Sequence, residues 1–226
     1  MDKEEKRHFY NSLVFPTVLV VILWIIKGIE YFAAISFARY GLEPQTLEGL
    51  QGIVFSPFLH ADFKHLIANS LPLFLLTAAL IYYYRRKGYV IFLFCWIITQ
   101  FWVWIFAKDT GVHIGASGIV YALAAFHLVG GMIKREPRMM AFALLVIFLY
   151  GSLIWGVFPY FLKDENISWQ SHLMGLLAGI VIALAYKNEG PQAKRYEWNE
   201  DEDVEDDENA YWKLKEDNEQ QKSEPL

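Results

Sequence analysis

The chain has 226 residues, of which 55% are hydrophobic and 17% aromatic, and its mean hydropathy is +0.24. This composition is too apolar for an ordinary soluble domain of this length and favours a membrane protein. The net charge of −5 combines two unlike regions. Residues 1–187 carry 15 Lys and Arg against 11 Asp and Glu, whereas residues 188–226 carry 5 against 14. We therefore expect a membrane domain over 1–187 and an acidic, disordered cytoplasmic tail over 188–226.

Six apolar runs follow one another within the first 187 residues. A hydrocarbon core of about 30 Å needs roughly 20 helical residues at about 1.5 Å each, and most of the runs approach this length. They lack the alternation that is typical of membrane β-barrel strands. The sequence therefore predicts an all-α polytopic membrane protein with six transmembrane helices, at about 9–26, 66–84, 89–107, 114–133, 139–162 and 172–186.

The basic residues gather in alternate connections between these runs. Because basic loops stay on the cytoplasmic side of a membrane, this pattern predicts that both termini are cytoplasmic. It also predicts that the second, fourth and sixth helices run parallel, from the outer side inward. The residues that carry the pattern are Lys3, Lys6, Arg7, Arg85, Arg86, Lys87, Lys134, Arg135, Arg138 and Lys187.

Three polar residues stand near the outer ends of those three parallel helices: Asn69, Ser117 and His172. A polar or titratable side chain inside a membrane helix indicates a functional site. Ser117 lies 16 residues before Ile133 and His172 lies 15 residues before Lys187. At about 1.5 Å per residue, both would lie about 22–24 Å from the cytoplasmic surface, at a similar depth. Each residue alone also has an ordinary structural explanation, as a backbone-bonded, capping or helix-packing group.

Two pairs of residues at helical spacing extend this cluster. Tyr121 is four residues after Ser117 and so shares its helix face, where the ring is expected to pack beneath the His172 imidazole. His65 and Asn69 are also four residues apart, so both donors can point in the same direction.

Glycines on the predicted sixth helix indicate close helix packing. Gly175 and Gly179 follow His172 at intervals that place them on its face, and Gly118 and Ala122 offer a matching small-residue face on the fourth helix. Faces of small residues let two backbones approach closely. We therefore expect the fourth and sixth helices to pack tightly enough for the serine hydroxyl to reach the imidazole.

Three motifs in this order resemble the rhomboid family of intramembrane serine proteases. They are "HADFKHLIAN" at 60–69, "GASGIVYAL" at 115–123 and "SHLMGLLAG" at 171–179. The Gly-x-Ser-Gly turn alone is weakly specific, but the three motifs on the second, fourth and sixth helices are strongly specific together. The resemblance covers about residues 10–187. The connection from about 33 to 55 lacks the Trp-Arg pair that family members often carry.

The resemblance implies an endopeptidase that cleaves membrane proteins within or beside their transmembrane helices. Its substrates would be single-span or other membrane proteins in the lipid bilayer, entering near the second and fifth helices, and nucleic acid would not be a partner. We expect an integral, multi-pass protein of a bacterial plasma (inner) membrane. The implied roles are Ser117 as nucleophile, His172 as general base and then acid, Asn69, His65 and the Ser117 backbone N–H as oxyanion donors, and Tyr121, Gly115, Gly118, Gly175 and Gly179 as supporting residues.

The sequence predicts a Ser–His dyad without a third acidic member, because no carboxylate stands within the helices at this depth. No cofactor is expected. No metal is expected either, because His60, His65 and His113 do not form a metalloprotease motif. Two alternatives remain: a non-catalytic relative of the same fold that binds membrane helices, and a small transporter or channel. The presence of both Ser117 and His172 argues against the first, and the absence of broken-helix repeats argues against the second.

Overall fold

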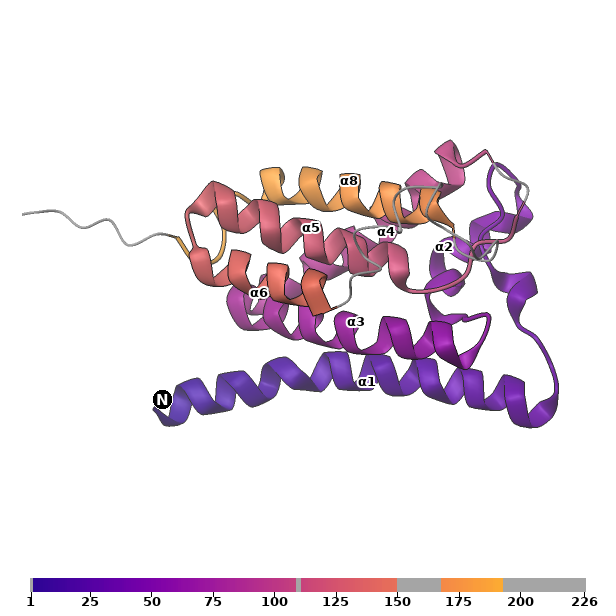
Figure 1. Cartoon of the computed structure of the whole chain (residues 1–226), viewed down its shortest axis with the longest axis horizontal. Coiled ribbons are helices and arrows are strands. Elements are labelled where there is room, and N and C mark those ends of the chain that lie inside the picture. The colour runs from indigo at the N-terminus through magenta and orange to yellow at the C-terminus, as the bar shows by residue number, and fades with distance from the viewer. Residues whose placement is uncertain (1, 109–110, 150–167, 193–226) are drawn as a thin grey trace, which may run out of the picture. The chain divides into compact units, whose positions relative to one another are not determined.

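The computed structural model describes residues 2–108, 111–149 and 168–192 (Figure 1). This part of the chain is helical, and its only β-type pairing is an isolated bridge between Leu42 and His113. The long helices are α1 (Lys3–Ala33), α3 (Phe63–Tyr84), α4 (Arg86–Phe106), α5 (Ser117–Lys134), α6 (Pro137–Leu149) and α8 (Trp169–Ala185). Four short elements form the connection between α1 and α3: η1 (Ala38–Tyr40), η2 (Glu48–Gln51), α2 (Gly52–Phe55) and η3 (Ser56–Phe58).

The all-α fold class predicted from hydropathy is confirmed. By length and composition, α1, α3, α4 and α5 are able to cross a membrane, while α6 and α8 are shorter apolar helices. The fifth predicted helix, 139–162, begins two residues after α6 does, but its second half, 150–162, lies outside the described residues. The number of six spans and the cytoplasmic position of both termini stay predictions.

All six long helices start two to six residues away from the predicted boundaries, and the two differences at the fourth and sixth predicted helices have a local cause. The fourth predicted helix begins at Ser117 rather than 114, because Gly115 has a φ of +115° that no helix accommodates. The sixth begins at Trp169 rather than 172, because the Ser168 side chain caps it by accepting a hydrogen bond of 3.1 Å from the Ser171 backbone N–H. These starts place Ser117 and His172 in the first turns of their helices.

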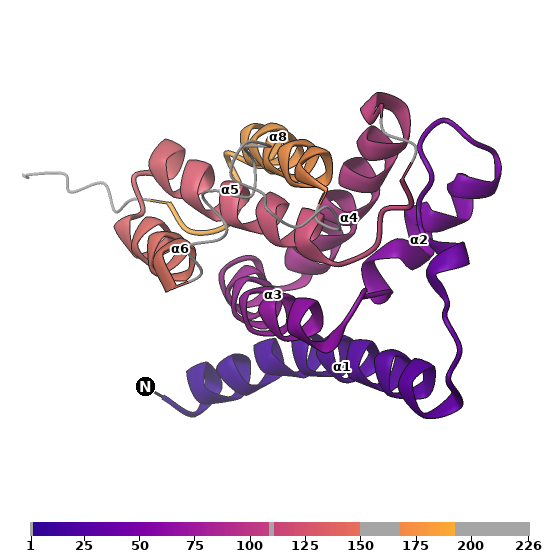
Figure 2. The ribbon, with the colours of Figure 1, turned by 45° about the vertical axis from the view of Figure 1, so that its right-hand side comes forward.

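Helix α5 is the buried centre of the described fold. Figure 2 shows it surrounded by α3, α4, α6 and α8, and it contacts each of them. A Cβ atom at Gly175 would lie 2.1 Å from the Gly118 carbonyl oxygen, and one at Gly179 would lie 2.1 Å from that of Ala122. Only glycine on α8 therefore lets these two backbones come so close.

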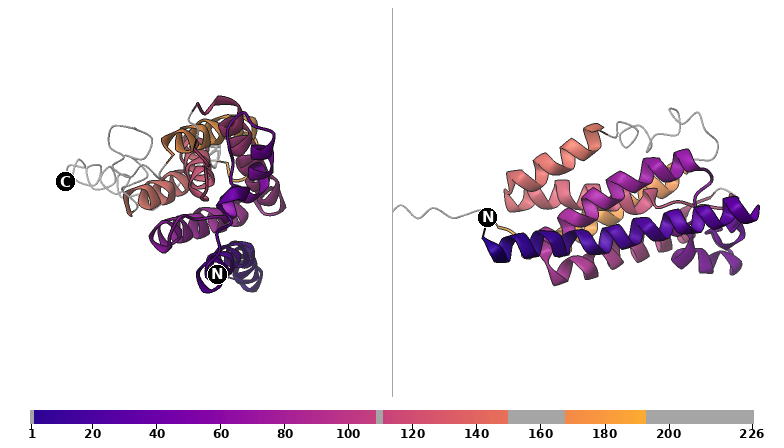
Figure 3. Two further views of the ribbon diagram at one scale, coloured as in Figure 1. Left: turned by 90° about the vertical axis from the view of Figure 1, so that its right-hand side faces the viewer. Right: turned by 90° about the horizontal axis from the view of Figure 1, so that it is seen from below.

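Helices α3, α5 and α8 run parallel, with their starts at one end and their final residues at the other (Figures 1 and 3). At the end where they finish, Lys87 forms an ion pair of 2.5 Å with Glu189. His8, near the start of α1, hydrogen-bonds the Tyr82 carbonyl at 2.9 Å. The start of α1 and the ends of these three helices therefore lie together, as the distribution of basic residues predicts.

Candidate active site

A serine and a histidine meet where α5 and α8 begin. The Ser117 Oγ lies 2.9 Å from the His172 Nε2, within hydrogen-bond distance. His172 is buried and sits one helical turn before Gly175, the first of the two glycines at which the α8 backbone approaches that of α5. The close packing of the helices thus brings two residues 55 positions apart into contact.

Tyr121 lies against one face of the histidine ring. Its ring and the His172 imidazole are stacked, with centroids 4.3 Å apart and planes inclined by 18°. Tyr121 is itself buried, one turn after Ser117 on α5. This stacking restricts the rotation of the imidazole and holds its Nε2 toward the serine.

The start of α5 presents backbone donors beside the serine hydroxyl. The first hydrogen bond within this helix runs from the Val120 N–H to the Ala116 carbonyl. The N–H groups of residues 117–119 therefore have no partner inside the helix. These groups form the positive end of the helix dipole, which favours negative charge. A negative charge that develops on a group bonded to the Ser117 hydroxyl oxygen would lie beside this positive end of the helix and be stabilised by it.

His65 and Asn69 stand one turn apart on α3, and the His65 ring lies against Gly115 in the loop that leads to Ser117. A Cβ at Gly115 would lie 2.6 Å from the His65 Cε1, so glycine is needed there for the ring to approach. Asn69 is buried, and its Nδ2 donates to the His65 carbonyl at 2.9 Å. Because an amide NH₂ has two protons, one N–H of Asn69 remains for another acceptor.

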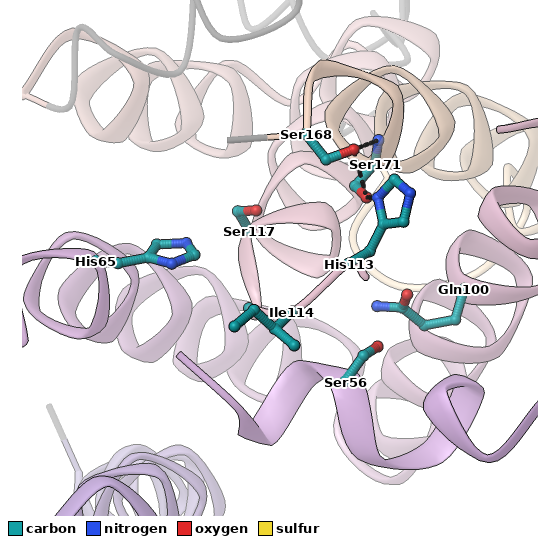
Figure 4. Close-up of a pocket in the computed structure, with 9 residues that line it drawn as sticks. Ser56, His65, Gln100, His113, Ile114, Ser117, Ser168 and Ser171 are labelled. Carbon is teal, nitrogen blue, oxygen red and sulfur yellow. Dashed lines mark hydrogen bonds between the residues drawn. The ribbon is translucent and has the colours of Figure 1, made fainter. Parts of the chain in front are cut away.

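A small polar pocket adjoins the serine. Figure 4 shows His65 reaching it from one side and His113 from the other, with Ser117 between them. His113 Nδ1 and the Ser171 Oγ are 3.1 Å apart, and the Ser171 hydroxyl donates to the Ser168 Oγ at 3.1 Å. The volume, about 10 Å³, is close to that needed for one water molecule. The lining residues are Ser56, His65, Gln100, His113, Ile114, Gly115, Ser117, Ser168 and Ser171.

Sequence reasoning missed several of these lining residues. Gln100 is a buried polar residue within the apolar run "IITQFWVW", and that contrast was a usable signal. Ser168 and Ser171 flank the start of α8, where a serine looks like an ordinary helix cap. Ser56 belongs to the irregular connection before α3, and no sequence pattern places it here. His113 entered the sequence reasoning only as a possible metal ligand.

A buried histidine and a lysine hold the turn that precedes His65. The His60 ring is 3% exposed, its centroid lies 5.2 Å from that of His65, and burial lowers the pKa of His60 to about 3. Lys27 Nζ donates to the carbonyls of His60 and Ala61 at 2.9 and 3.0 Å. It also pairs with the buried Glu30 carboxylate at 3.1 Å. Helix α1 thereby fixes the segment that leads into His65 and Asn69.

The chain is similar to known proteins over most of its length. A family model described as the Rhomboid domain matches residues 48–189. An uncharacterized protein of Mycobacterium tuberculosis is 32% identical over 184 residues, covering 77% of this chain and 74% of that protein. YdcA of Bacillus subtilis, provisionally named a rhomboid protease, is 26% identical over 182 residues, covering 77% of this chain and 87% of its own.

The matched region contains Ser117, His172, Tyr121, His65, Asn69 and every residue that lines the pocket, and the family model covers more than half of the chain. The described helices are apolar, and four of them are long enough to cross a membrane. The chain therefore belongs to the rhomboid family and is an intramembrane serine protease.

Proposed function

We propose that the protein cleaves peptide bonds in or next to transmembrane segments of membrane proteins, using Ser117 and His172 as a catalytic dyad. The observation that carries the proposal is the 2.9 Å contact between Ser117 Oγ and His172 Nε2. A serine hydroxyl is a weak nucleophile until a neighbouring base accepts its proton. The stacked Tyr121 ring supports the proposal, because it keeps that base in one orientation.

In this mechanism, His172 takes the Ser117 proton as Oγ attacks the scissile carbonyl carbon. His172 then gives the proton to the leaving amine, and an acyl-enzyme remains on Ser117. The oxyanion of each tetrahedral intermediate is stabilised by the Ser117 backbone N–H, the Asn69 amide and the His65 ring. One such donor typically contributes about 10²–10³ in rate. Gly115, Gly118, Gly175 and Gly179 support the site by letting the backbones and rings come close.

The second half of the reaction needs a water molecule beside the acyl-enzyme. The polar pocket next to Ser117 has room for about one, and its serine, histidine and glutamine side chains offer it partners. His172 then acts again as base and transfers the proton of this water to Ser117. Every step is an acyl or proton transfer, so the chemistry requires no cofactor.

We also propose that the chain crosses a bacterial plasma (inner) membrane six times with both termini in the cytoplasm. The basic residues at the end of the bundle where α3, α5 and α8 finish support this orientation. Ser117 and His172 then lie toward the outer side, below the membrane surface. The natural substrates are single-span or other membrane proteins, and the acidic residues 188–226 form a cytoplasmic tail.

The test is cleavage of a single-span reporter protein in liposomes by the wild type, Ser117→Ala and His172→Ala. We expect each substitution to abolish cleavage while the protein remains folded. Ser12→Ala is a matched control, because Ser12 is a buried helix serine whose hydroxyl bonds only the Phe9 carbonyl among the described residues. Cleavage by folded Ser117→Ala at the wild-type rate would refute the proposal.

A further inference from the structure

An apolar groove, separate from the serine site, opens between α1 and the connection that follows it. Its volume is about 430 Å³, within the range of small-molecule binding sites. All its lining side chains are aliphatic or aromatic. They are Ile22 and Ile26 of α1, Phe37 and Tyr40 around η1, and Phe55, Phe58 and Leu59 around η3.

The surface around this groove is itself apolar. Two of the residues that line the groove are exposed, Phe55 by about half and Ile22 by 38%, and so is Val54, the neighbour of Phe55 in the chain. Exposed apolar patches on this scale mark a surface that meets another apolar phase. In a membrane protein, that phase is the lipid around α1, so the groove opens toward acyl chains.

One fixed cation stands at the rim of the groove. The Arg39 guanidinium lies 4.6 Å from the centre of the Tyr40 ring and donates to the Tyr40 hydroxyl at 2.5 Å. Arg39 is exposed and forms no ion pair within the described part of the chain, whereas Lys27 nearby is paired with Glu30. Tyr40 thus has its ring in the groove wall and holds an uncompensated positive charge at its edge.

The groove has a polar end and a deeper apolar end. The Phe37 backbone N–H donates to the Glu30 carboxylate at 2.7 Å, which places the start of the connection beside the last turns of α1. Ile26 and Ile22 lie one and two helical turns further back along α1, away from that end. The groove therefore runs from the Arg39 rim along α1 toward the interior of the bilayer.

We infer that this groove binds an anionic phospholipid, with one acyl chain along Ile26 and Ile22 and the phosphate on Arg39. A guanidinium matches a phosphate in both charge and hydrogen-bond geometry. A transmembrane helix does not suit the groove, because a helix with its side chains is about 10–12 Å wide and would overfill it. A single acyl chain is apolar like the lining of the groove and is thin enough to fit its volume.

The test is a lipid titration of the delipidated full-length protein in a neutral detergent, followed by native mass spectrometry. We expect the wild type to retain one phosphatidylglycerol with a Kd about fivefold lower than that of phosphatidylcholine with the same acyl chains, the factor typical of one exposed ion pair. Arg39→Gln should remove this difference, and Arg39→Lys should keep part of it. Ile26→Trp fills the groove and should weaken both lipids by about tenfold.

Arg135→Gln is the matched control, because Arg135 is an exposed arginine at the opposite end of the bundle and should leave both Kd values unchanged. Equal binding of the two lipids by the wild type would overturn the inference. So would an unchanged phosphatidylglycerol preference in Arg39→Gln. A photocrosslinker at Phe55 that captures the reporter helix instead of lipid would assign the groove to substrate and also overturn it.

Discussion

The close contact between α5 and α8 leads to a sharp prediction for Gly175→Ala. The new Cβ would lie 2.1 Å from the Gly118 carbonyl oxygen, whereas carbon–oxygen contacts settle at about 3.3 Å. The helices must then separate by about 1.2 Å. This shift would take the 2.9 Å contact between Ser117 and His172 beyond hydrogen-bond range. A displacement of about 1 Å can cost about 10²-fold in rate, and overpacking costs about 1–3 kcal/mol.

The assay is the initial rate of reporter cleavage in liposomes, with unfolding in detergent measured on the same preparations. Gly28→Ala is the control, because a Cβ at Gly28, in the interior of α1, would meet nothing within 4 Å. Alanine there should leave cleavage unchanged and stabilise α1 by about 0.5–1 kcal/mol. Wild-type rate and stability in Gly175→Ala would refute the reasoning that glycine sets the distance between the two catalytic side chains.

Three further predictions follow from single contacts. Tyr121→Phe should keep most of the cleavage rate, because the stacked ring remains. Tyr121→Leu should lower the rate at least tenfold. Equal cleavage rates in the two variants would contradict the role of the ring in orienting His172. Burial lowers the pKa of His60 from 6.5 to about 3 in the folded protein. Between pH 3 and pH 6.5, His60 therefore binds a proton only in the unfolded chain. His60 should therefore make stability fall by about 1.4 kcal/mol per pH unit as the pH drops below 6.5. His60→Gln should remove this contribution from unfolding curves and leave the smaller one of His65, which is only partly buried. Lys27→Met leaves Glu30 buried without its cation, so unfolding in detergent should show a loss of about 3 kcal/mol, and an unchanged unfolding curve would contradict the pairing.

The helices could be predicted from hydropathy because each long apolar run has few other stable conformations in a membrane. The meeting of Ser117 and His172 could be predicted for a related reason. Parallel helices of known rise place residues at calculable depths, and glycines on matching faces indicate which helices touch. Those two rules are geometric, so they need no knowledge of the connections.

The connection from residue 34 to 62 could not be predicted in the same way. Its short helical turns have no apolar period, and their positions depend on contacts such as the Trp96 indole N–H donating to the Ile53 carbonyl at 2.8 Å. No sequence pattern therefore predicts that Ser56 lines the pocket or that Phe55 and Tyr40 line the groove. The pocket residue Gln100 differs because it lies on α4, where an amide within an apolar helix is a signal present in the sequence.

The most direct test of the dyad is reaction of the folded protein with a fluorophosphonate probe, which bonds covalently to activated serines. Peptide mass spectrometry then locates the adduct. The mechanism predicts one adduct, on Ser117, and a loss of labelling in His172→Ala because the hydroxyl no longer has its base. An adduct on another serine, or labelling of Ser117 at the same rate without His172, would contradict the central claim.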